Sequence, residues 1–257
     1  TSFNGNAIYT VPSIMNNPNL QPEKTKSTEF GLEMSFLKNR IGFDINKYRA
    51  LTVNQIIPVD VSRATGYSQK FINAGSILNK GIELTMFISP IKKKDFSWDI
   101  NLNWSRNRNT VLSLPDIDNI TLASLQGGVS INASVGEAYG TIKGKDYIYD
   151  DKGNRMIDTN TGYWMVTASS NNIIGNITPK WIGGVRNSFK YKNFAFGFLI
   201  DMKKGGSVFS LDQFYGAQTG IYDNSVGKND LGNDIRADVS EGGGVILDGV
   251  KPDGTKN

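Results

Sequence analysis

The 257-residue chain lacks both cysteine and histidine. Without cysteine it has no disulfide scaffold, zinc ribbon, iron–sulfur ligation or thiolate nucleophile. Without histidine it has no Ser-His-Asp or Cys-His catalysis, no imidazole metal ligand and no histidine pH switch. Most familiar catalytic chemistries are therefore excluded. We expect a protein that is not an enzyme and has no catalytic residue, metal or cofactor.

Long apolar runs are missing as well. No stretch approaches the roughly 18 consecutive apolar residues that indicate a transmembrane helix. Residues 1–6 show neither the basic region nor the apolar region of a signal peptide. We therefore expect the chain to start after processing or partway through a longer protein.

Charge is nearly balanced, with 28 basic and 24 acidic residues and a net charge of +4. The two signs are interspersed, so we expect no nucleic-acid partner. Glycine and aromatic residues, by contrast, are plentiful, with 28 glycines and an aromatic fraction of 11%. This combination indicates many turns and many exposed aromatic side chains.

Strict alternation of apolar and polar residues is the clearest pattern. It runs without a break from Phe96 to Trp104 and recurs in residues 82–89. A period of two predicts strands with one apolar and one polar face, and the polar turn at residues 90–95 joins them into a hairpin. By the same alternation Glu83 lies on the polar face. Two further hairpins are predicted on these grounds: residues 29–36 with 41–45, and residues 181–191 with 194–202.

The connections between the predicted strands are asymmetric. The hairpin turns are short, whereas the other connections span residues 49–73, residues 106–172 and everything beyond residue 203. Loops longer than about 12 to 15 residues are uncommon in compact domains, but a transmembrane β-barrel has short periplasmic turns and long external loops. The pattern predicts an all-β fold, an antiparallel transmembrane β-barrel with long extracellular loops. A soluble β-sandwich that binds glycans is an open alternative.

A series of short motifs runs from about Asn17 to the end of the chain. It includes Asn19-Leu20-Gln21-Pro22-Glu23, Glu29-Phe30-Gly31, Asn73-Ala74-Gly75, Lys80-Gly81-Ile82-Glu83-Leu84, Gly136-Glu137-Ala138-Tyr139-Gly140 and Gly175-Asn176-Ile177-Thr178-Pro179. Their order and spacing resemble the SusC/RagA-type TonB-dependent outer-membrane transporters of Bacteroidetes. No single motif is specific to that family.

The resemblance implies outer-membrane nutrient import: TonB-dependent uptake of oligosaccharides or peptides together with a SusD-like surface lipoprotein. It implies a barrel of about 22 strands in outer-membrane lipid, and a TonB complex that acts through a plug domain. The sequence shows only about seven to nine strand-like segments and no plug. We therefore expect residues 1–257 to be a partial barrel region, with the plug domain and the C-terminal strands absent. A passive porin-type barrel is a further alternative.

Four aromatic residues fall on the predicted extracellular loops: Tyr67, Phe71, Tyr163 and Trp164. Exposed loop aromatics commonly stack on ligands or contact partner proteins. We therefore take these four as candidate substrate- or partner-contact residues. Packing within a folded loop is the alternative for each of them.

Three other features carry weaker signals. Residues 146–158 place oxygen ligands at short spacing, but they lack the 12-residue calcium-loop pattern, and Asp150 to Asn154 is more simply a β-turn. Residues 208–215 do not alternate and predict a short helix. A glycoside hydrolase would need two opposed carboxylates, and nothing in the sequence places such a pair.

Overall fold

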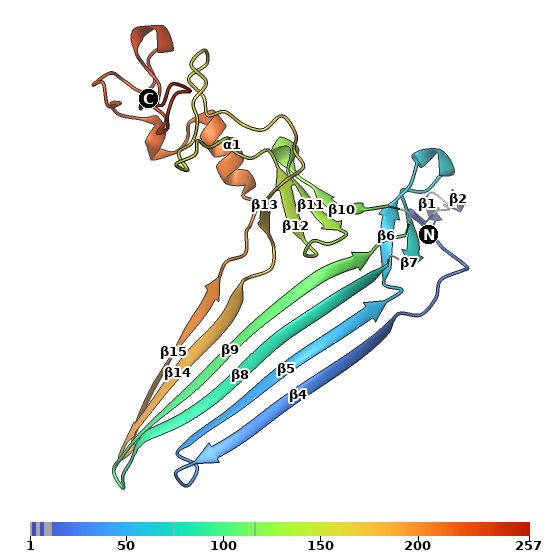
Figure 1. The fold of residues 1–257 in the computed structure, drawn as a ribbon, viewed down its shortest axis with the longest axis vertical. Coiled ribbons are helices and arrows are strands. Elements are labelled where there is room, and N and C mark those ends of the chain that lie inside the picture. Colours follow the sequence, from blue (N-terminus) through green and yellow to red (C-terminus); the bar gives the residue numbers. More distant parts are fainter. Residues whose placement is uncertain (1, 4–5, 8–11, 74, 116) are drawn as a thin grey trace. The chain divides into compact units, whose positions relative to one another are not determined.

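Two compact units make up the computed structural model, which describes residues 2–3, 6–7, 12–73, 75–115 and 117–257 (Figure 1). Unit 1 comprises Thr1–Ile120, Asn132–Gly140 and Thr178–Gly206. Unit 2 comprises Thr121–Ile131, Thr141–Ile177 and Ser207–Asn257.

Six long strands form the main sheet, which lies in unit 1. In chain order they are β4 (Lys24–Phe36), β5 (Ile41–Val53), β8 (Ser76–Lys92), β9 (Phe96–Ser113), β14 (Trp181–Tyr191) and β15 (Phe194–Lys204). Their order in the sheet is β15-β14-β9-β8-β5-β4, and every neighbouring pair is antiparallel. The three predicted hairpins are confirmed, and Figure 1 shows their short turns at one end of the sheet. Among the described residues, no helix has the length and apolar character needed to cross a membrane.

The strands are longer than the alternation predicts. β9 has 18 residues and β8 has 17, so strand structure extends into segments that the sequence predicts as loops. Arg106 and Arg108 follow Trp104 in the alternation, which hides the strand from a search for apolar side chains although the backbone pairing continues. The prediction of seven to nine barrel strands is also wrong for the described residues, where the main sheet has six.

The two faces of the main sheet differ in chemistry. Cross-strand partners share a face, so the register groups side chains into rows. One row contains Leu32, Ile45, Leu84, Trp104, Gly183 and Met202. The adjacent row, on the opposite side, contains Gly31, Asn46, Glu83, Ser105, Ile182 and Lys203. We call the side of the first row the apolar face and the side of the second the polar face.

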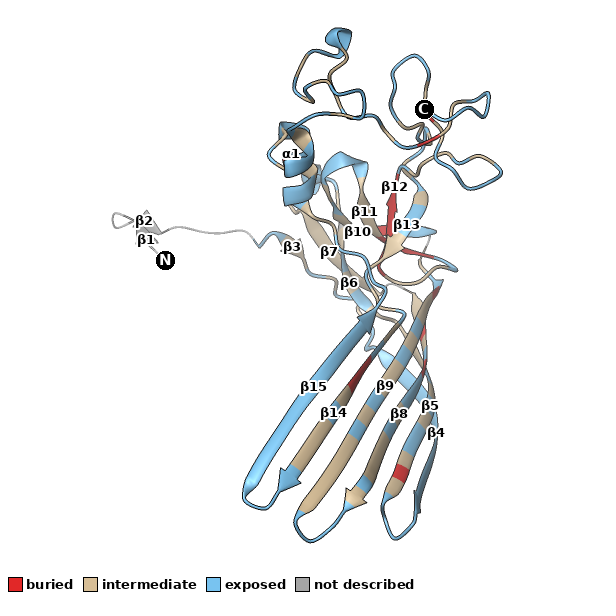
Figure 2. Ribbon diagram, turned by 90° about the vertical axis from the view of Figure 1, so that its left-hand side faces the viewer, coloured by how far each residue is buried: buried red, intermediate tan, exposed pale blue. Residues whose placement is uncertain are grey.

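The apolar face is exposed. Phe30, Phe194 and Phe196 keep 73%, 77% and 65% of their surface accessible, and Figure 2 shows the outermost strands β4 and β15 exposed along their length. A β-sandwich buries such side chains between two sheets, whereas a transmembrane barrel turns them to lipid. The soluble-sandwich interpretation is therefore wrong. Within the described residues β4 pairs only with β5 and β15 only with β14, so the sheet is an open portion of a barrel.

Aromatic side chains gather on the apolar face near the short turns. The rings of Trp98 and Phe189 stack at 5.6 Å, and Phe189 lies 6.3 Å from Phe196. The Trp98 indole Nε1 donates to Asn187 Oδ1 at 3.1 Å, which satisfies the polar end of the ring. Such a band is typical of the membrane–water interface of barrels.

Shorter strands precede β4 in the chain or lie in the connections between the long strands. β3 (Ile14–Met15), β7 (Gln69–Asn73) and β6 (Ile56–Asp60) form a sheet in that order, and the 3₁₀ helix η1 (Arg63–Thr65) lies between β6 and β7 in the chain. β1 (Ser2–Phe3) pairs with β2 (Asn6–Ala7). A four-stranded sheet contains β10 (Asn119–Ser124), β11 (Ser130–Ser134), β12 (Thr141–Gly144) and β13 (Asn172–Asn176) in that order.

Unit 2 contains β12, β13 and the helix α1 (Leu211–Thr219). It also contains the 3₁₀ helices η2 (Gln126–Gly128), η3 (Asp223–Ser225) and η4 (Val239–Glu241). The Ser210 hydroxyl accepts from the Gln213 amide at 3.2 Å and starts α1, and Gly220, with φ of 68°, ends it. A short helix is thus confirmed, although it begins and ends later than residues 208–215. The largest fully buried side chain of this unit is that of Ile157.

Candidate functional site

A hydrogen-bonded ladder of polar side chains crosses the polar face of the main sheet. Tyr48 on β5 donates its hydroxyl hydrogen to Asn107 Oδ1 on β9 at 3.1 Å, and Asn107 Nδ2 donates to Asn79 Oδ1 on β8 at 3.3 Å. Tyr48 can reach across β8 because its partner there is Gly81. A Cβ on Gly81 would overlap the tyrosine ring, so this close approach requires glycine.

Residues 134–140 fold back onto the end of this ladder. The Val111 amide donates to Glu137 O at 2.9 Å, and the Gly136 amide donates to Val111 O at 2.8 Å. The Tyr139 amide donates to Asn109 Oδ1 at 2.9 Å. A cleft of about 230 Å³ lies beside these contacts and is lined by Thr52, Gln55, Ile77, Asn79, Asn109 and Tyr139. The cleft offers amide and hydroxyl groups that can both donate and accept hydrogen bonds.

Glu83 lies on the polar face between Asn46 and Ser105, as the alternation predicts. No groups of His, Cys, Asp or Glu that could hold a metal ion occur in the part of the chain that the structure describes. The polar face is suited to a hydrated passage or to reversible binding, since it combines the neutral groups of the ladder with carboxylates such as Glu83.

Two of the predicted loop aromatics, Tyr67 and Phe71, belong to unit 1. Tyr67 follows η1, and its amide donates to Thr65 Oγ1 at 3.4 Å. Phe71 lies on β7, opposite Pro58 of β6. Both side chains are half-buried, so each offers part of its ring to a ligand or partner.

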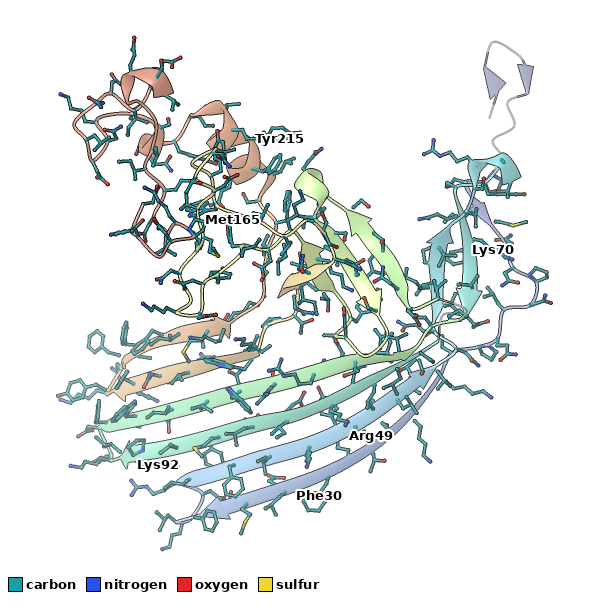
Figure 3. The ribbon with its side chains drawn as sticks, turned by 45° about the horizontal axis from the view of Figure 1, so that its top comes forward. Phe30, Arg49, Lys70, Lys92, Met165 and Tyr215 are labelled. Carbon is teal, nitrogen blue, oxygen red and sulfur yellow. The ribbon has the colours of Figure 1, made fainter. Side chains whose placement is uncertain are left out.

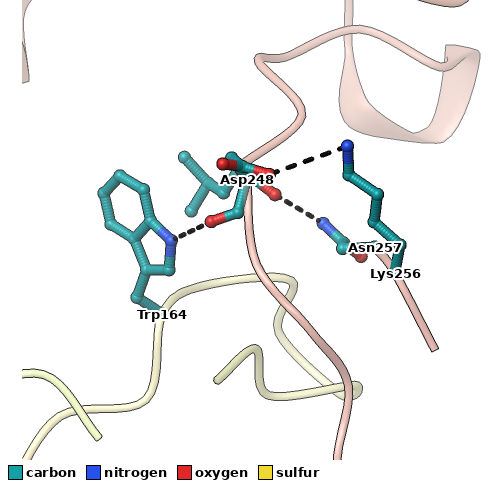
Figure 4. A network of polar contacts seen from close by, with 5 residues as sticks. Trp164, Asp248, Lys256 and Asn257 are labelled. Carbon is teal, nitrogen blue, oxygen red and sulfur yellow. Dashed lines mark hydrogen bonds and ion pairs between the residues drawn. The ribbon is translucent and has the colours of Figure 1, made fainter. Parts of the chain in front are cut away.

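The other two, Tyr163 and Trp164, belong to unit 2 and differ from each other in exposure. Figure 4 shows the polar contacts of Trp164. Tyr163 is 71% exposed. Trp164 is half-buried, and its Nε1 donates to the backbone carbonyl of Asp248 at 2.9 Å. Its ring meets Tyr147 edge to face at 5.3 Å, and the Arg155 guanidinium lies 4.8 Å from its centroid. Trp164 therefore connects segments that are far apart in the sequence.

A polar hollow of about 740 Å³ lies beside this aromatic cluster. Its lining includes Tyr149, Arg155, Asp248 and Lys256. Arg155 also lies 4.4 Å from the centroid of the Tyr147 ring, an arrangement that holds the guanidinium by cation–π attraction. Asp248 and Lys256 approach to 3.9 Å, with 92% and 82% of their side chains exposed, so this ion pair contributes little stability. Planar aromatic surface beside charged groups suits a polar ligand such as a sugar or a peptide.

The segment that could have held calcium is a turn. Asp150 Oδ1 accepts from the amides of Lys152 and Asn154 at 2.9 Å and 2.7 Å, and Oδ2 accepts from Asn154 Nδ2 at 2.9 Å. The hydrogen bonds from Asn154 hold the pKa of Asp150 below its ordinary value of 3.8. The β-turn interpretation is confirmed, because the carboxylate oxygens already serve backbone and side-chain donors of the turn.

Three polar residues of this candidate site, Tyr48, Asn107 and Asn109, are not identified by the sequence pattern. Asn107 and Asn109 continue the alternation of Asn101 and Asn103 on the polar face, so the sequence does carry a signal for these two residues beyond Trp104. The role of Tyr48 has no such signal, since it depends on Gly81 and Asn107 of two other strands.

The model of the family described as "TonB dependent receptor-like, beta-barrel" matches residues 1–240. The chain belongs to this family. TonB-dependent receptors are not enzymes, which agrees with the excluded chemistries.

Curated relatives of this receptor chain support the same assignment. TonB-dependent receptor P3 of Formosa agariphila is 27% identical over 213 residues, which cover 75% of the chain and 21% of the relative. TonB-dependent receptor SusC of Bacteroides thetaiotaomicron is 26% identical over 248 residues, which cover 90% of the chain and 25% of the relative. The resemblance to SusC-type receptors is therefore confirmed. The receptor chain spans about a quarter or less of the length of these relatives.

A solved structure shares the fold. The structure of the RagAB peptide transporter superposes with a TM-score of 0.67 at 21% identity, covering 88% of the receptor chain and 25% of the solved chain. Similarity at this level of identity shows a common β-barrel architecture.

Proposed function

We propose that this receptor takes part in TonB-dependent nutrient import across the outer membrane and that residues 1–257 form one portion of its barrel wall. The observation that carries the proposal is the two-faced main sheet of a TonB-dependent receptor. In the closed barrel the apolar face contacts lipid and the polar face lines the lumen. Import then consists of binding and gated passage, with no bond made or broken by these residues.

The proposed cargo is an oligosaccharide or a peptide. A structural neighbour that transports peptides supports the second choice, and the similarity to SusC supports a SusD-like surface lipoprotein as partner. TonB would act through a plug domain, which none of the described residues provides. Tyr67, Phe71, Tyr163 and Trp164 are the proposed contacts to cargo or lipoprotein.

Energised uptake tests the activity. Cells that lack the receptor gene would be complemented with the full-length receptor and supplied with labelled oligosaccharides and peptides. We expect uptake of one class by complemented cells and its loss when the gene for TonB is also deleted. Uptake that persists without TonB would favour the passive-porin alternative.

Cysteine labelling tests the orientation of the sheet, because residues 1–257 contain no cysteine. Labelling of the unsubstituted full-length receptor gives the background from the rest of the protein. Leu102 and Asn103 are neighbours on β9 but lie on the apolar and polar faces respectively. With the full-length receptor in outer membranes, a water-soluble maleimide should label Asn103→Cys and spare Leu102→Cys. Equal labelling of the two would contradict the assignment of lipid and lumen faces.

A further inference from the structure

Charge is segregated between the two faces of the main sheet. Within the six strands, the carboxylates all lie on the polar face: Glu29, Glu33, Asp44, Glu83, Asp99 and Asp201. The charged side chains of the apolar face are all basic: Lys24, Lys26, Lys47, Arg49, Lys80, Arg106, Arg108 and Lys204. A charged side chain in contact with lipid tails is energetically unfavourable. The basic side chains on the apolar face must therefore have other surroundings or a function.

Five of these cations lie together, and we call them the basic cluster: Lys47, Arg49, Lys80, Arg106 and Arg108. Arg49 lies directly opposite Lys80, and Lys80 lies directly opposite Arg108. In the next row Ile82 separates Lys47 from Arg106. Adjacent strands are about 4.8 Å apart and alternate residues about 7 Å apart, so the five Cα atoms occupy a patch of roughly 10 by 7 Å.

This arrangement is unfavourable in the receptor alone. Like charges directly opposite each other destabilise a sheet, and here three stand in one row across β5, β8 and β9. All five side chains are exposed. No ion pair joins any of them to another residue of the described chain. An anion from outside would remove the repulsion.

The surface at the basic cluster is shaped for an amphiphile. A groove of about 700 Å³ is lined by the five cations together with Thr28, Phe30, Tyr48, Gly81 and Ile82. Phe30 pairs with Lys47 across β4 and β5, and Figure 3 shows Phe30 and Arg49 on these neighbouring strands. Cationic and apolar groups therefore share one groove. A free anion would use only the cations, whereas a lipid would use both.

The basic cluster lies one membrane thickness from the aromatic band. On β9, Arg106 and Arg108 follow Trp98 by eight and ten residues. At about 3.3 Å per residue and a tilt of about 40°, this is roughly 20 to 25 Å along the membrane normal, close to the apolar height of barrels. Figure 3 shows Lys92 at the short-turn end and Arg49 far from it. The cluster thus falls at the boundary on the side of the long connections.

We propose that the basic cluster binds the phosphate groups of an anionic lipid in the outer leaflet, whose acyl chains lie on the apolar face below. This inference rests on the proposed outer-membrane location. The guanidinium groups of Arg49, Arg106 and Arg108 can each bind a phosphate with two parallel hydrogen bonds, and the lysines add point charges. Their aliphatic stems can lie along the apolar surface while their charged ends reach the headgroups.

Lipid binding by the purified full-length receptor tests the proposal. The probes are bisphosphorylated lipid A and the same lipid after enzymatic removal of its phosphates, each in neutral-detergent micelles. Wild type should bind the phosphorylated lipid at least about tenfold more tightly. Arg49→Gln/Lys80→Gln/Arg108→Gln should lose that preference, because each basic residue near an anionic surface contributes on the order of fivefold.

Two matched variants separate local binding from net charge. Arg186→Gln/Lys190→Gln/Lys203→Gln removes the same charge from exposed positions of the polar face and should keep the preference. Arg49→Lys/Arg106→Lys/Arg108→Lys keeps the charge and should retain most of the binding. Folding of each variant is checked by β-sheet circular dichroism, and the wild-type comparison of the two lipids needs no variant.

Three results would overturn the lipid site. The first is equal wild-type affinity for both lipids. The second is a loss of lipid preference in the polar-face variant as large as that in the basic-cluster variant. The third is displacement of the lipid by millimolar inorganic phosphate, which would indicate a free-anion site. Uptake by cells is a separate readout. Lost lipid preference with intact TonB-dependent uptake rejects only this inference, whereas absent TonB-dependent uptake rejects the proposed function.

Discussion

The ring of Tyr48 lies over Gly81, its cross-strand partner, and its hydroxyl reaches Asn107 on the strand beyond. The same relationship recurs on the polar face, where Phe87 lies over Gly42 and a Cβ on that glycine would overlap the ring. A large side chain that covers a glycine on the neighbouring strand fixes the register and fills the surface that glycine leaves open.

Replacing Gly81 should displace Tyr48. We expect Gly81→Ala to destabilise the full-length receptor by roughly 1–3 kcal/mol, since overpacking forces the ring out of its place and breaks its bond to Asn107. The measurement is the temperature at which the folded receptor loses its fast migration on a denaturing gel. Gly81→Ala/Tyr48→Ala should recover part of the loss. Wild-type stability of the single variant would contradict the close approach.

A charge in the middle of the apolar face should destabilise the folded receptor far more than a charge on the polar face. Leu102→Arg should destabilise the folded receptor by roughly 2–4 kcal/mol, because the guanidinium would enter the hydrocarbon region. Asn103→Arg, one residue further on the opposite face, should have a much smaller effect. Unfolding by urea in lipid vesicles, followed by tryptophan fluorescence, compares the two. Similar midpoints would argue against a lipid-facing apolar side.

Substitutions of Trp164 and Tyr163 should have different effects. The first should lower the stability of the loop, and the second should weaken contact with a ligand or partner. Trp164→Phe removes the hydrogen bond to the Asp248 carbonyl, which is worth about 1 kcal/mol. We expect faster amide exchange around residues 147–165 and 248–250 in that variant. Tyr163→Ala should leave exchange unchanged, because its ring is exposed, and should weaken cargo or lipoprotein binding. Faster exchange in Tyr163→Ala would show that its ring also packs in the loop.

The turn at Asp150 should lose stability as the pH is lowered. Its pKa is lowered from 3.8. The largest cause is the hydrogen bond from the Asn154 side chain, followed by the hydrogen bond from the Asn154 backbone amide. A lowered pKa means that the ionised carboxylate stabilises the turn fully above pH 3.8, and this contribution is lost as pH falls through the lower folded value. The carboxyl carbon resonance of Asp150 in selectively labelled receptor should titrate below 3.8, and Asn154→Ala should raise the midpoint toward it. An unchanged midpoint in that variant would contradict the assigned cause.

Predictions from the sequence are correct where the residues of a single strand are enough to identify it and its two faces. The run from Phe96 to Trp104 predicts a strand and its two faces without reference to any partner, and β9 contains it. The apolar alternation ends earlier than the strand, because Arg106 and Arg108 break the apolar pattern but not the backbone pairing. The loop aromatics were identified from their position alone, and nothing in that position distinguishes the packed Trp164 from the exposed Tyr163.

The sequence by itself determined the all-β architecture, the hairpins, the two-faced strands and the kind of receptor, because local alternation, turn residues and motif order are all properties of the chain. Only the tertiary structure decided which residues become neighbours. The pairing of β5 with β8, and of β9 with β14, joins strands separated by long connections. That register places Tyr48 over Gly81 and brings Arg49, Lys80 and Arg108 into one row. A shift of one residue would turn these side chains to the opposite face, and no local pattern specifies the match across such distances.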